Sequence, residues 1–265
     1  MTPETAEKLR RFFGAFAGGA SPLLLLDYDG TLAPFRLDRF QARPWAGVRE
    51  LLSEIQRQGR TRMTVITGRP AQEIAPLLAI DPPLEVWGLH GAERLFPDGR
   101  RELDRAPSAA REKLNELCTQ LRRNSMGGRF EDKANGVVMH WRGASRRQAK
   151  HIEQRARALF EPLARADGLR LLESEAGLEL CVGRDKGDAV EAIVREAGPG
   201  APIAFLGDDS TDEAAFRALN CAGLPGLSVL MRRQWRESEA NIWLRPPGEL
   251  REFLAQWLLI CRAQS

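Results

Sequence analysis

Short runs of apolar residues alternate along the chain with longer stretches in which apolar residues recur every three or four positions. The runs lie within residues 23–26, 61–66, 83–89, 201–206, 227–231 and 241–244, and the longer stretches include 45–58, 186–198, 210–223 and 248–263. Runs this short, bounded by Gly, Asp or Pro, are typical of parallel strands buried on both faces. The longer stretches indicate helices, as the spacing of Val48, Leu52 and Ile55 illustrates. The first of these helices is expected to end at Gly59. The pattern predicts a parallel α/β sheet with right-handed crossovers.

The alternation changes between about residue 99 and residue 182. A helical stretch at 111–123 is followed by a predicted hairpin that turns at Ala134–Gly136. An arginine-rich helical stretch at 146–165 comes next, and a second predicted hairpin turns at Glu175–Gly177. Antiparallel hairpins combined with helices indicate a separate α+β module inserted into the sheet domain.

This change divides the chain into two predicted domains. We expect a core domain formed by residues 1–104 and 184–265, and an inserted domain at 105–183. Two crossings, near residues 99–106 and near Gly183, would join them, and two such links permit hinge closure. The first twenty residues are expected to contain a helix, because their apolar residues recur at helical spacing. Whether that helix packs on the sheet or binds a partner stays open at this point.

Composition narrows the classes of function. Of the 265 residues, 39 are Lys or Arg and 36 are Asp or Glu, which gives a net charge of +3 with opposite charges interspersed. This balance does not indicate a nucleic-acid partner. The four cysteines form no CxxC pair, so reduced thiols are favoured over a zinc site or a disulfide framework. No apolar run of 18 residues and no signal-peptide core occur, so we expect a cytoplasmic protein without a membrane span.

Polar residues that can carry chemistry directly follow several of the predicted strands. They are Asp27 and Asp29 after the first run, Thr67, Gly68 and Arg69 after the second, Asp208, Asp209, Asp212 and Glu213 after the fourth, and Lys186 at the start of a later helix. Ligands of open parallel sheets bind outside the carboxyl ends of the strands. The sequence therefore predicts that these acids, one hydroxyl and one lysine meet in a single crevice.

This combination suits phosphoryl transfer through an aspartyl phosphate. One carboxylate can attack phosphorus, and a second one two residues later can donate and accept protons. Mg²⁺ prefers oxygen ligands and usually keeps several waters, so few carboxylates are needed. A lysine and a hydroxyl can hold the phosphoryl oxygens. Each motif alone has a plain alternative, such as a capping aspartate, a Thr-Gly turn or a surface lysine, and it is their conjunction that favours catalysis.

At these residues the chain resembles the haloacid dehalogenase superfamily of phosphatases. The matching motifs are DYDGT at 27–31, TGR at 67–69, RDKG at 184–187 and GDDSTDE at 207–213. The resemblance implies a Rossmann-like parallel-sheet core with an inserted mixed α/β cap domain. It also implies that Asp27 is the nucleophile, Asp29 the general acid/base, and that Thr67 and Lys186 hold the phosphate. For Mg²⁺ it implies Asp27, the backbone carbonyl of Asp29 and Asp208 as ligands, with Asp209 and Asp212 close behind.

Three further stretches resemble trehalose-6-phosphate phosphatases within that superfamily. They are GLHGAE at 88–93, FEDKANGVVMHWR at 130–142 and GLEL at 177–180. The resemblance implies Mg²⁺-dependent hydrolysis of trehalose 6-phosphate to trehalose and phosphate, the last step of trehalose biosynthesis. It leaves open an association with the synthase that makes this substrate. The chain departs from the family pattern at Tyr28, where Phe is common, and in the short link before Lys186, which leaves the angle of the cap hinge open.

Alternation along the inserted strands predicts one apolar face and one polar face. Residues expected on the polar face are Glu131, Lys133, His140, Arg142 and Glu179. Such side chains can bind sugars, because each sugar hydroxyl both donates and accepts hydrogen bonds. The alternative is a face that is merely solvated. Further expected substrate contacts are Gly68, Arg69 and His90, although a loop histidine bonded within the protein is the alternative for His90.

Two rival functions stay open at the level of sequence. The first keeps the chemistry and changes the substrate to another sugar phosphate, such as sucrose phosphate or a glycosyl-glycerate phosphate. The second is a catalytically silent module that binds sugar phosphates for regulation. The complete set of Asp27, Asp29, Thr67, Lys186 and Asp208 argues against silence. Hydrolysis of p-nitrophenyl phosphate with and without Mg²⁺ separates the classes, and a screen of sugar phosphates separates the substrates.

Overall fold

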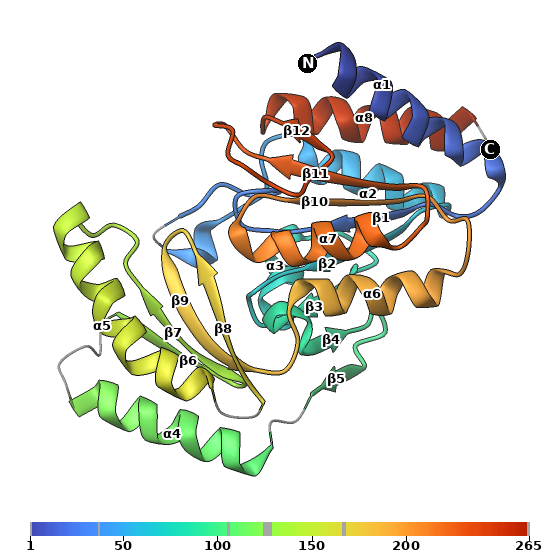
Figure 1. The fold of residues 1–265 in the computed structure, drawn as a ribbon. Helices are drawn as coiled ribbons and strands as arrows, with labels where there is room; N and C mark the ends of the chain where they lie inside the picture. Colours follow the sequence, from blue (N-terminus) through green and yellow to red (C-terminus); the bar gives the residue numbers. More distant parts are fainter. Residues whose placement is uncertain (1, 37, 105–106, 124–128, 166–167, 264–265) are drawn as a thin grey trace. The chain divides into compact units, whose positions relative to one another are not determined.

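The computed structural model describes the chain except for residues 1, 37, 105–106, 124–128, 166–167 and 264–265 (Figure 1). The chain divides into two compact units. The larger unit contains residues 1–102 and 185–265, and the smaller unit contains residues 103–184. Part of the first expected crossing, at 105–106, lies outside the described residues.

A mainly parallel sheet forms the centre of the larger unit. Its strands are β1 (Leu23–Leu26), β2 (Arg62–Ile66), β3 (Glu85–Gly88), β4 (Glu93–Leu95), β5 (Arg101–Leu103), β10 (Ile203–Gly207), β11 (Gly226–Met231) and β12 (Ile242–Leu244). They are arranged in the order β12-β11-β10-β1-β2-β3-β4-β5. The six strands that the apolar runs predict pair in parallel, which confirms that part of the fold. β1 lies between β10 and β2, so the residues that follow these three strands emerge at one edge of the sheet.

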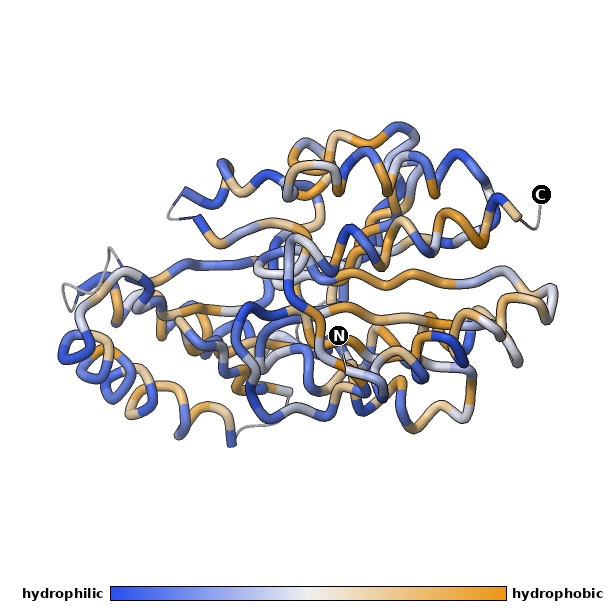
Figure 2. The backbone as a smooth tube through the Cα atoms, turned by 90° about the horizontal axis from the view of Figure 1, so that it is seen from above, coloured by the Kyte–Doolittle hydropathy of each residue, from blue (hydrophilic) through white to orange (hydrophobic). Residues whose placement is uncertain are grey.

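Helices cover both faces of this sheet. Those of the larger unit are α1 (Pro3–Gly14), α2 (Val48–Gln58), α3 (Ile74–Leu78), α6 (Lys186–Ala197), α7 (Glu213–Cys221) and α8 (Gly248–Ala263). Apolar residues of α1, α2, α3 and α8 form one buried cluster with one face of the sheet, and those of α6 and α7 form another with the opposite face. Figure 2 shows orange and blue alternating along the helices, whereas long extended segments near the centre of the view are mostly orange. None of the helices in the described part of the chain has the length and apolar character needed to cross a membrane.

The amino-terminal helix packs on the carboxy-terminal one, which answers the question that the sequence left open. Phe12, Phe13 and Phe16 surround Trp257 of α8, with ring centroids 4.8–6.1 Å apart. The three phenylalanines are almost completely buried. Aromatic contacts of this kind add to the stabilisation that comes from burying the rings. The segment therefore forms part of the core of the larger unit.

Three elements of the larger unit are absent from the prediction. β4 pairs antiparallel with β3, and β5 extends the sheet beyond β4. Both contain only three residues, two of which are charged, so they produce no apolar run. α3 has five residues and contains Pro76, and this is too short for a helical periodicity to be visible.

The smaller unit is an antiparallel sheet covered by two helices on one face. Its strands are β6 (Phe130–Lys133), β7 (Gly136–His140), β8 (Leu169–Ser174) and β9 (Gly177–Val182), arranged in the order β6-β7-β9-β8. Its helices are α4 (Ser108–Arg123) and α5 (Arg146–Ala164). Both predicted hairpins are present. Leu178, Leu180, Val137 and Met139 are buried against α4 and α5, so the opposite face of the sheet carries the polar residues.

Candidate active site

Asp27 lies at the centre of the edge of the sheet where the parallel strands end. It directly follows β1, and its backbone N–H continues the ladder by donating to the Leu206 carbonyl of β10 at 2.8 Å. Its side chain is 5% exposed. A buried carboxylate is costly unless another group compensates its charge, so the neighbours of Asp27 decide what it can do.

Lys186 is the cation that compensates Asp27. Its Nζ donates to Asp27 Oδ1 at 2.6 Å and to Asp212 Oδ1 at 2.7 Å. The lysine is the first residue of α6, where the Asp185 side chain accepts hydrogen bonds from the Gly187 and Asp188 amides and caps the helix. The cap fixes the start of α6, and with it the backbone from which Lys186 reaches into the site.

The charges of Asp27, Lys186 and Asp212 shift the pKa values of Asp27 and Lys186. Burial raises the pKa of Asp27 to about 7, against the opposite effect of Lys186, and Asp212 adds to the rise. Burial alone would lower the pKa of Lys186, but Asp212 and Asp27 together raise it above its ordinary value. The lysine therefore stays protonated, and the excess of carboxylates makes the site favourable for a further cation.

Asp27, Asp208 and Asp212 form a cluster of buried carboxylates. Each offers an oxygen within 4.8 Å of the others. Asp27 Oδ2 and Asp208 Oδ1 are buried, and no hydrogen-bond donor among the described residues reaches either atom. Burial, followed by the charge of Asp27, raises the pKa of Asp208 well above its ordinary value. Two buried carboxylate oxygens without a donor, on residues of one cluster, fit a divalent cation that prefers oxygen ligands.

Asp212 differs from the other two acids because its oxygens are engaged within the protein. Its Oδ1 accepts from Lys186, and its Oδ2 accepts from the backbone amides of Asp208 and Asp209, each at 2.9 Å. The Asp209 side chain bonds to the amide and hydroxyl of Ser210. In the described residues the buried cluster thus includes Asp212, whereas Asp209, expected as a ligand, stands outside it.

Gly30 brings the loop after β1 against Asp208. Its φ is +93°, a conformation that side-chain-bearing residues rarely adopt. A Cβ at this position would lie 2.1 Å from Asp208 Oδ2, so only glycine allows the two loops to approach this closely. The glycine of the DYDGT motif thereby places the backbone next to Asp29 close to the acidic cluster.

Asp29 is paired with Arg69. The guanidinium donates through Nε and Nη2 to the two carboxylate oxygens, both at 2.5 Å, and through Nη1 to the Arg39 carbonyl at 2.8 Å. It also lies over the ring of Tyr28, 5.5 Å from its centroid. Arg69 was expected to contact substrate. In this structure it holds the expected acid/base residue, an arrangement that spacing along the chain does not reveal.

Thr67, Gly68 and His90 line the same edge beside β2. Thr67 is 1% exposed, its amide donates to the Trp87 carbonyl, and its carbonyl accepts from the His90 amide at 2.9 Å. A Cβ on Gly68 would lie 2.6 Å from His90 Cε1, so the imidazole packs directly on the glycine. His90 is buried, with a φ of +57°. These residues form the wall of the site on the β2 side.

The smaller unit carries four of the expected sugar contacts on the face of its sheet opposite α4 and α5. Lys133 Nζ donates to Glu179 Oε2 at 2.8 Å, and both side chains are 9% exposed. His140 Nε2 lies 3.2 Å from Glu131 Oε2. The register explains the grouping, because Val138 pairs with Glu131 on one side and with Glu179 on the other. Arg142 lies beyond the end of β7, and its side chain is exposed.

Two arginines lie near the acidic residues but were not among the site residues expected from the sequence. Arg232 and Arg236 follow β11, and both donate to the backbone carbonyls after β10. The sequence contained a signal that could have identified these arginines. Residues just after the apolar run at 227–231 emerge at the same edge of the sheet as the acidic residues.

Comparison with known proteins gives consistent results. A family model described as Trehalose-phosphatase matches residues 25–241. A trehalose-phosphate phosphatase of Mycobacterium ulcerans is 30% identical over 245 residues, which cover 88% of this chain and 60% of the relative.

Two solved structures show the fold that the chain shares. The C-terminal domain of a C. albicans trehalose-6-phosphate phosphatase superposes with a TM-score of 0.80 at 19% identity, covering 98% of this chain and 97% of that one. A haloacid dehalogenase-like hydrolase from B. subtilis superposes with a TM-score of 0.62 at 16% identity, covering 88% and 98%. Both likenesses show a haloacid dehalogenase-like fold, in which a mainly parallel α/β sheet is accompanied by a separate antiparallel sheet.

The match of the family model is the decisive one for classification. It covers most of the chain and includes the carboxylate cluster, Lys186 and the polar face of the smaller unit. The chain spans about 60% of the length of the mycobacterial relative. From the family model and this geometry together, the chain belongs to the trehalose-phosphatase family.

Proposed function

We propose that this protein is a phosphatase that converts trehalose 6-phosphate to trehalose and phosphate, the last step of trehalose biosynthesis. The observation that carries the proposal is the state of Asp27. Its Oδ1 is held by Lys186, while its buried Oδ2 meets no donor among the described residues and lies in the carboxylate cluster. The substrate is proposed from the relatives, which are trehalose-phosphate phosphatases.

The proposed reaction has two displacements at phosphorus. In the first, Asp27 attacks the phosphorus, the bond between phosphorus and the sugar oxygen breaks, and Asp29 gives a proton to that oxygen. In the second, Asp29 takes a proton from a water molecule that attacks the phosphorus, and the bond to Asp27 breaks. Phosphate leaves and both carboxyl groups return to their starting states. Lys186 and Thr67 hold the phosphoryl oxygens through both steps.

Mg²⁺ is the cofactor that the site fits. The unpartnered oxygens of Asp27 and Asp208 would hold it, together with the backbone of Asp29, while Asp212 orients Lys186 and the backbone after β10. When bound, the ion supplies positive charge that offsets the repulsion between the anionic nucleophile and the phosphate. No histidine or cysteine belongs to the cluster in the described residues, which favours a hard cation over zinc.

We propose that the polar face of the smaller unit recognises the sugar. Glu131, Lys133 and Glu179 place charged groups on this face of the sheet, where Lys133 pairs with Glu179 and Glu131 pairs with His140. Hydrogen bonds between charged groups and sugar hydroxyls are stronger than those between neutral partners. Binding energy from hydroxyls remote from phosphorus can then raise the rate for the cognate substrate.

The test is a phosphate-release screen on the full chain. Trehalose 6-phosphate, sucrose phosphate, a glycosyl-glycerate phosphate and glucose 6-phosphate are compared at equal concentration, first with Mg²⁺ and then after chelation. We expect the highest kcat/KM for trehalose 6-phosphate, loss of activity on chelation and recovery on adding Mg²⁺. Full activity after exhaustive chelation would contradict the metal requirement. A higher kcat/KM for another sugar phosphate would replace the substrate and keep the chemistry.

A further inference from the structure

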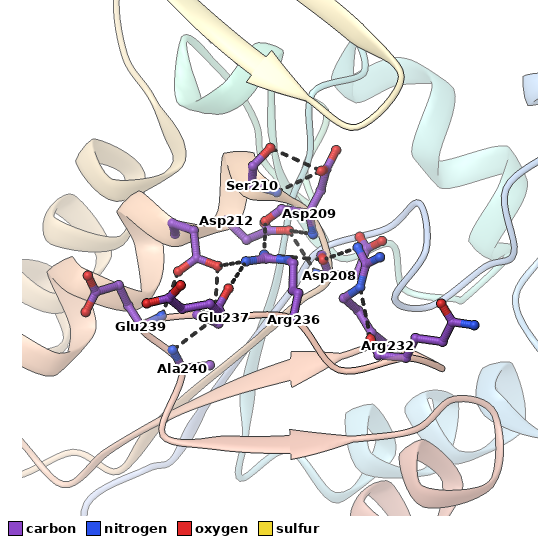
Figure 3. A network of polar contacts seen from close by, with 12 residues as sticks. Asp208, Asp209, Ser210, Asp212, Arg232, Arg236, Glu237, Glu239 and Ala240 are labelled. Atoms are coloured by element: carbon purple, nitrogen blue, oxygen red, sulfur yellow. Dashed lines mark hydrogen bonds and ion pairs between the residues drawn. The ribbon is translucent and has the colours of Figure 1, made fainter. Parts of the chain in front are cut away.

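The loop after β11 reaches back over the acidic residues that follow β10. β11 pairs in parallel with β10, so both strands end at the same edge of the sheet. Residues 232–241 contain three arginines, Arg232, Arg233 and Arg236. Two of them contact the turn of Asp208 and Asp209, as Figure 3 shows, whereas Arg233 lies over the ring of Trp45, 5.5 Å from its centroid.

Hydrogen bonds hold the turn of Asp208 and Asp209 from both sides. Arg236 Nη2 donates to the Asp209 carbonyl at 2.8 Å and to the Asp208 carbonyl at 3.4 Å, and Arg232 Nη1 donates to the Asp208 carbonyl at 3.1 Å. On the other side, Asp212 Oδ2 accepts from the amides of both aspartates at 2.9 Å. The N–H and carbonyl groups of two successive residues are therefore fixed at once.

This anchoring acts against a specific repulsion. Asp208 presents an unpartnered, buried oxygen close to the carboxylates of Asp27 and Asp212. Like charges at such distances favour any backbone movement that separates them. A turn held at both its amides and its carbonyls cannot relax in this way without losing hydrogen bonds.

The charge of Arg236 is itself compensated. Its Nη1 pairs with Glu213 Oε1, at the start of α7. Glu213 also accepts from the Ser238 hydroxyl at 2.9 Å and from the Glu239 amide at 2.8 Å. The guanidinium thus supplies hydrogen bonds to the turn while a carboxylate neutralises its positive charge, which would otherwise repel a cation bound beside Asp208.

We propose that Arg236, assisted by Arg232, is a positioning residue for the metal site, an inference that rests on the proposed function. It keeps the Asp208 carboxylate directed at the position shared with Asp27, so that the site is preformed before the cation binds. Residues that orient metal ligands in this manner typically change metal affinity about 10–100-fold when they are replaced. A residue that merely closes the loop would affect stability without a selective effect on the metal.

The experiment measures Mg²⁺ binding calorimetrically on the full chain at constant pH and ionic strength. Five proteins are compared: the wild type, Arg236→Met, Arg236→Lys, Arg232→Met and Arg233→Met. Arg236→Met is expected to raise the Kd for Mg²⁺ at least about 10-fold. Arg236→Lys should recover part of this loss, because an ammonium can reach a carbonyl but cannot reproduce the fork of the guanidinium. Arg233→Met, on the same loop but away from the turn, should leave the Kd unchanged.

Thermal unfolding with and without Mg²⁺ gives a second readout. Mg²⁺ should raise the Tm of Arg236→Met less than that of the wild type, because the stabilisation by a ligand decreases as its Kd rises. If Arg236→Met does not fold, the Kd for Mg²⁺ of Arg236→Lys and Arg232→Met is compared with that of the wild type instead. A wild-type Kd in the Arg236 and Arg232 variants would overturn this inference alone. Absence of Mg²⁺ binding to the wild type would overturn the metal part of the proposed function and the inference with it.

Discussion

Individual carboxylates near β1 have different tasks because they have different partners. Asp27 and Asp208 each retain a buried oxygen that meets no donor among the described residues, whereas both oxygens of Asp212 bond to groups of the protein. Asp29 is held by the guanidinium of Arg69 through two contacts of 2.5 Å. For Asp27 and Asp208, the oxygen available to a cation is the one that the surrounding protein leaves unbonded, whereas Asp29 must release a bond to Arg69 before it transfers a proton.

Replacing Asp27 by Asn tests its role at the scale of the residue. Asn matches the shape of Asp but is a far poorer nucleophile, so phosphate release should fall by more than about 10³-fold, as the loss of a nucleophile typically causes. The fold should persist, because Lys186 keeps its bond to Asp212 and one of three clustered carboxylates is removed. Single-turnover phosphate release and the Tm are measured together. Asp98→Asn, in an exposed loop, serves as the control, and release near the wild-type rate by Asp27→Asn would remove Asp27 as the nucleophile.

At the scale of elements, α6 contributes to the molecule at both of its ends. Its first residue is Lys186, and near its other end Glu196 bonds to Arg62 of β2 and to Arg94 of β4. The same arginines bond to the buried Glu85 of β3. This network joins the helix to three strands of the sheet, so it contributes to holding the helix that carries the catalytic lysine.

We expect Glu196→Gln to reduce stability in a pH-dependent way. Burial tends to raise the pKa of Glu196, but its bonds to Arg94 and Arg62 lower it overall. Because the folded pKa lies below the unfolded one, the carboxylate stabilises the protein fully above its ordinary value of 4.5 and loses this effect as the pH falls through the lower folded value. The carboxylate is 38% exposed, so solvent screening limits the loss to about 1 kcal/mol or less at pH 7.

Urea unfolding at pH 7 and at several values below pH 4.5 measures this effect. The difference in unfolding free energy between wild type and Glu196→Gln should shrink as the pH decreases. Glu191→Gln, on an exposed position of the same helix, is the matched control and should change little at any pH. A difference that stays constant across the range would show that the charge of Glu196 is not what joins the elements.

At the scale of the whole molecule, the chain separates the proposed chemistry from the proposed recognition. The carboxylate cluster and Lys186 belong to the larger unit, and the polar face with Glu131 and Glu179 belongs to the smaller one. If this division of labour is correct, substitutions in the smaller unit should affect the choice of substrate, and substitutions in the cluster should affect every substrate.

Glu131→Gln tests this division with an opposite-face control on the same strand. Glutamine still forms hydrogen bonds but has no charge, so the expected loss is the difference between a charged hydrogen bond (about 1.5–3 kcal/mol) and a neutral one (about 0.5–1.5 kcal/mol), and kcat/KM for trehalose 6-phosphate should fall roughly 5-fold to 12-fold. Hydrolysis of p-nitrophenyl phosphate, which lacks the sugar, should stay close to that of the wild type. Asp132→Asn, whose carboxylate bonds to Arg122, should leave both activities unchanged. Steady-state kinetics on both substrates tests this prediction. If Glu131→Gln lowers kcat/KM equally for the two substrates, Glu131 supports the fold or the chemistry.

The sequence by itself determined the parallel strands, most of the helices and the residues at the strand ends. Apolar runs and helical spacing are local patterns, and a buried strand must end where charged residues such as Asp27 and Asp208 follow it. The inserted hairpins were also predictable, because alternation and turn residues lie close together in the chain. β4 and β5 were missed because two of their three residues are charged and no apolar run results, and α3 was missed because five residues are too few to show a helical period.

Tertiary structure alone decided how these residues are partnered. The pairing of Arg69 with Asp29, the engagement of both Asp212 oxygens and the reach of Arg236 to the turn after β10 join residues that lie on different elements. Such contacts depend on the order of strands and on the path of loops, which spacing along the chain does not specify. The sequence therefore determined which chemical groups reach the edge of the sheet, and the packing of the folded chain decided which of their atoms stay unbonded, because hydrogen-bond geometry is set only once the strands and helices are in place.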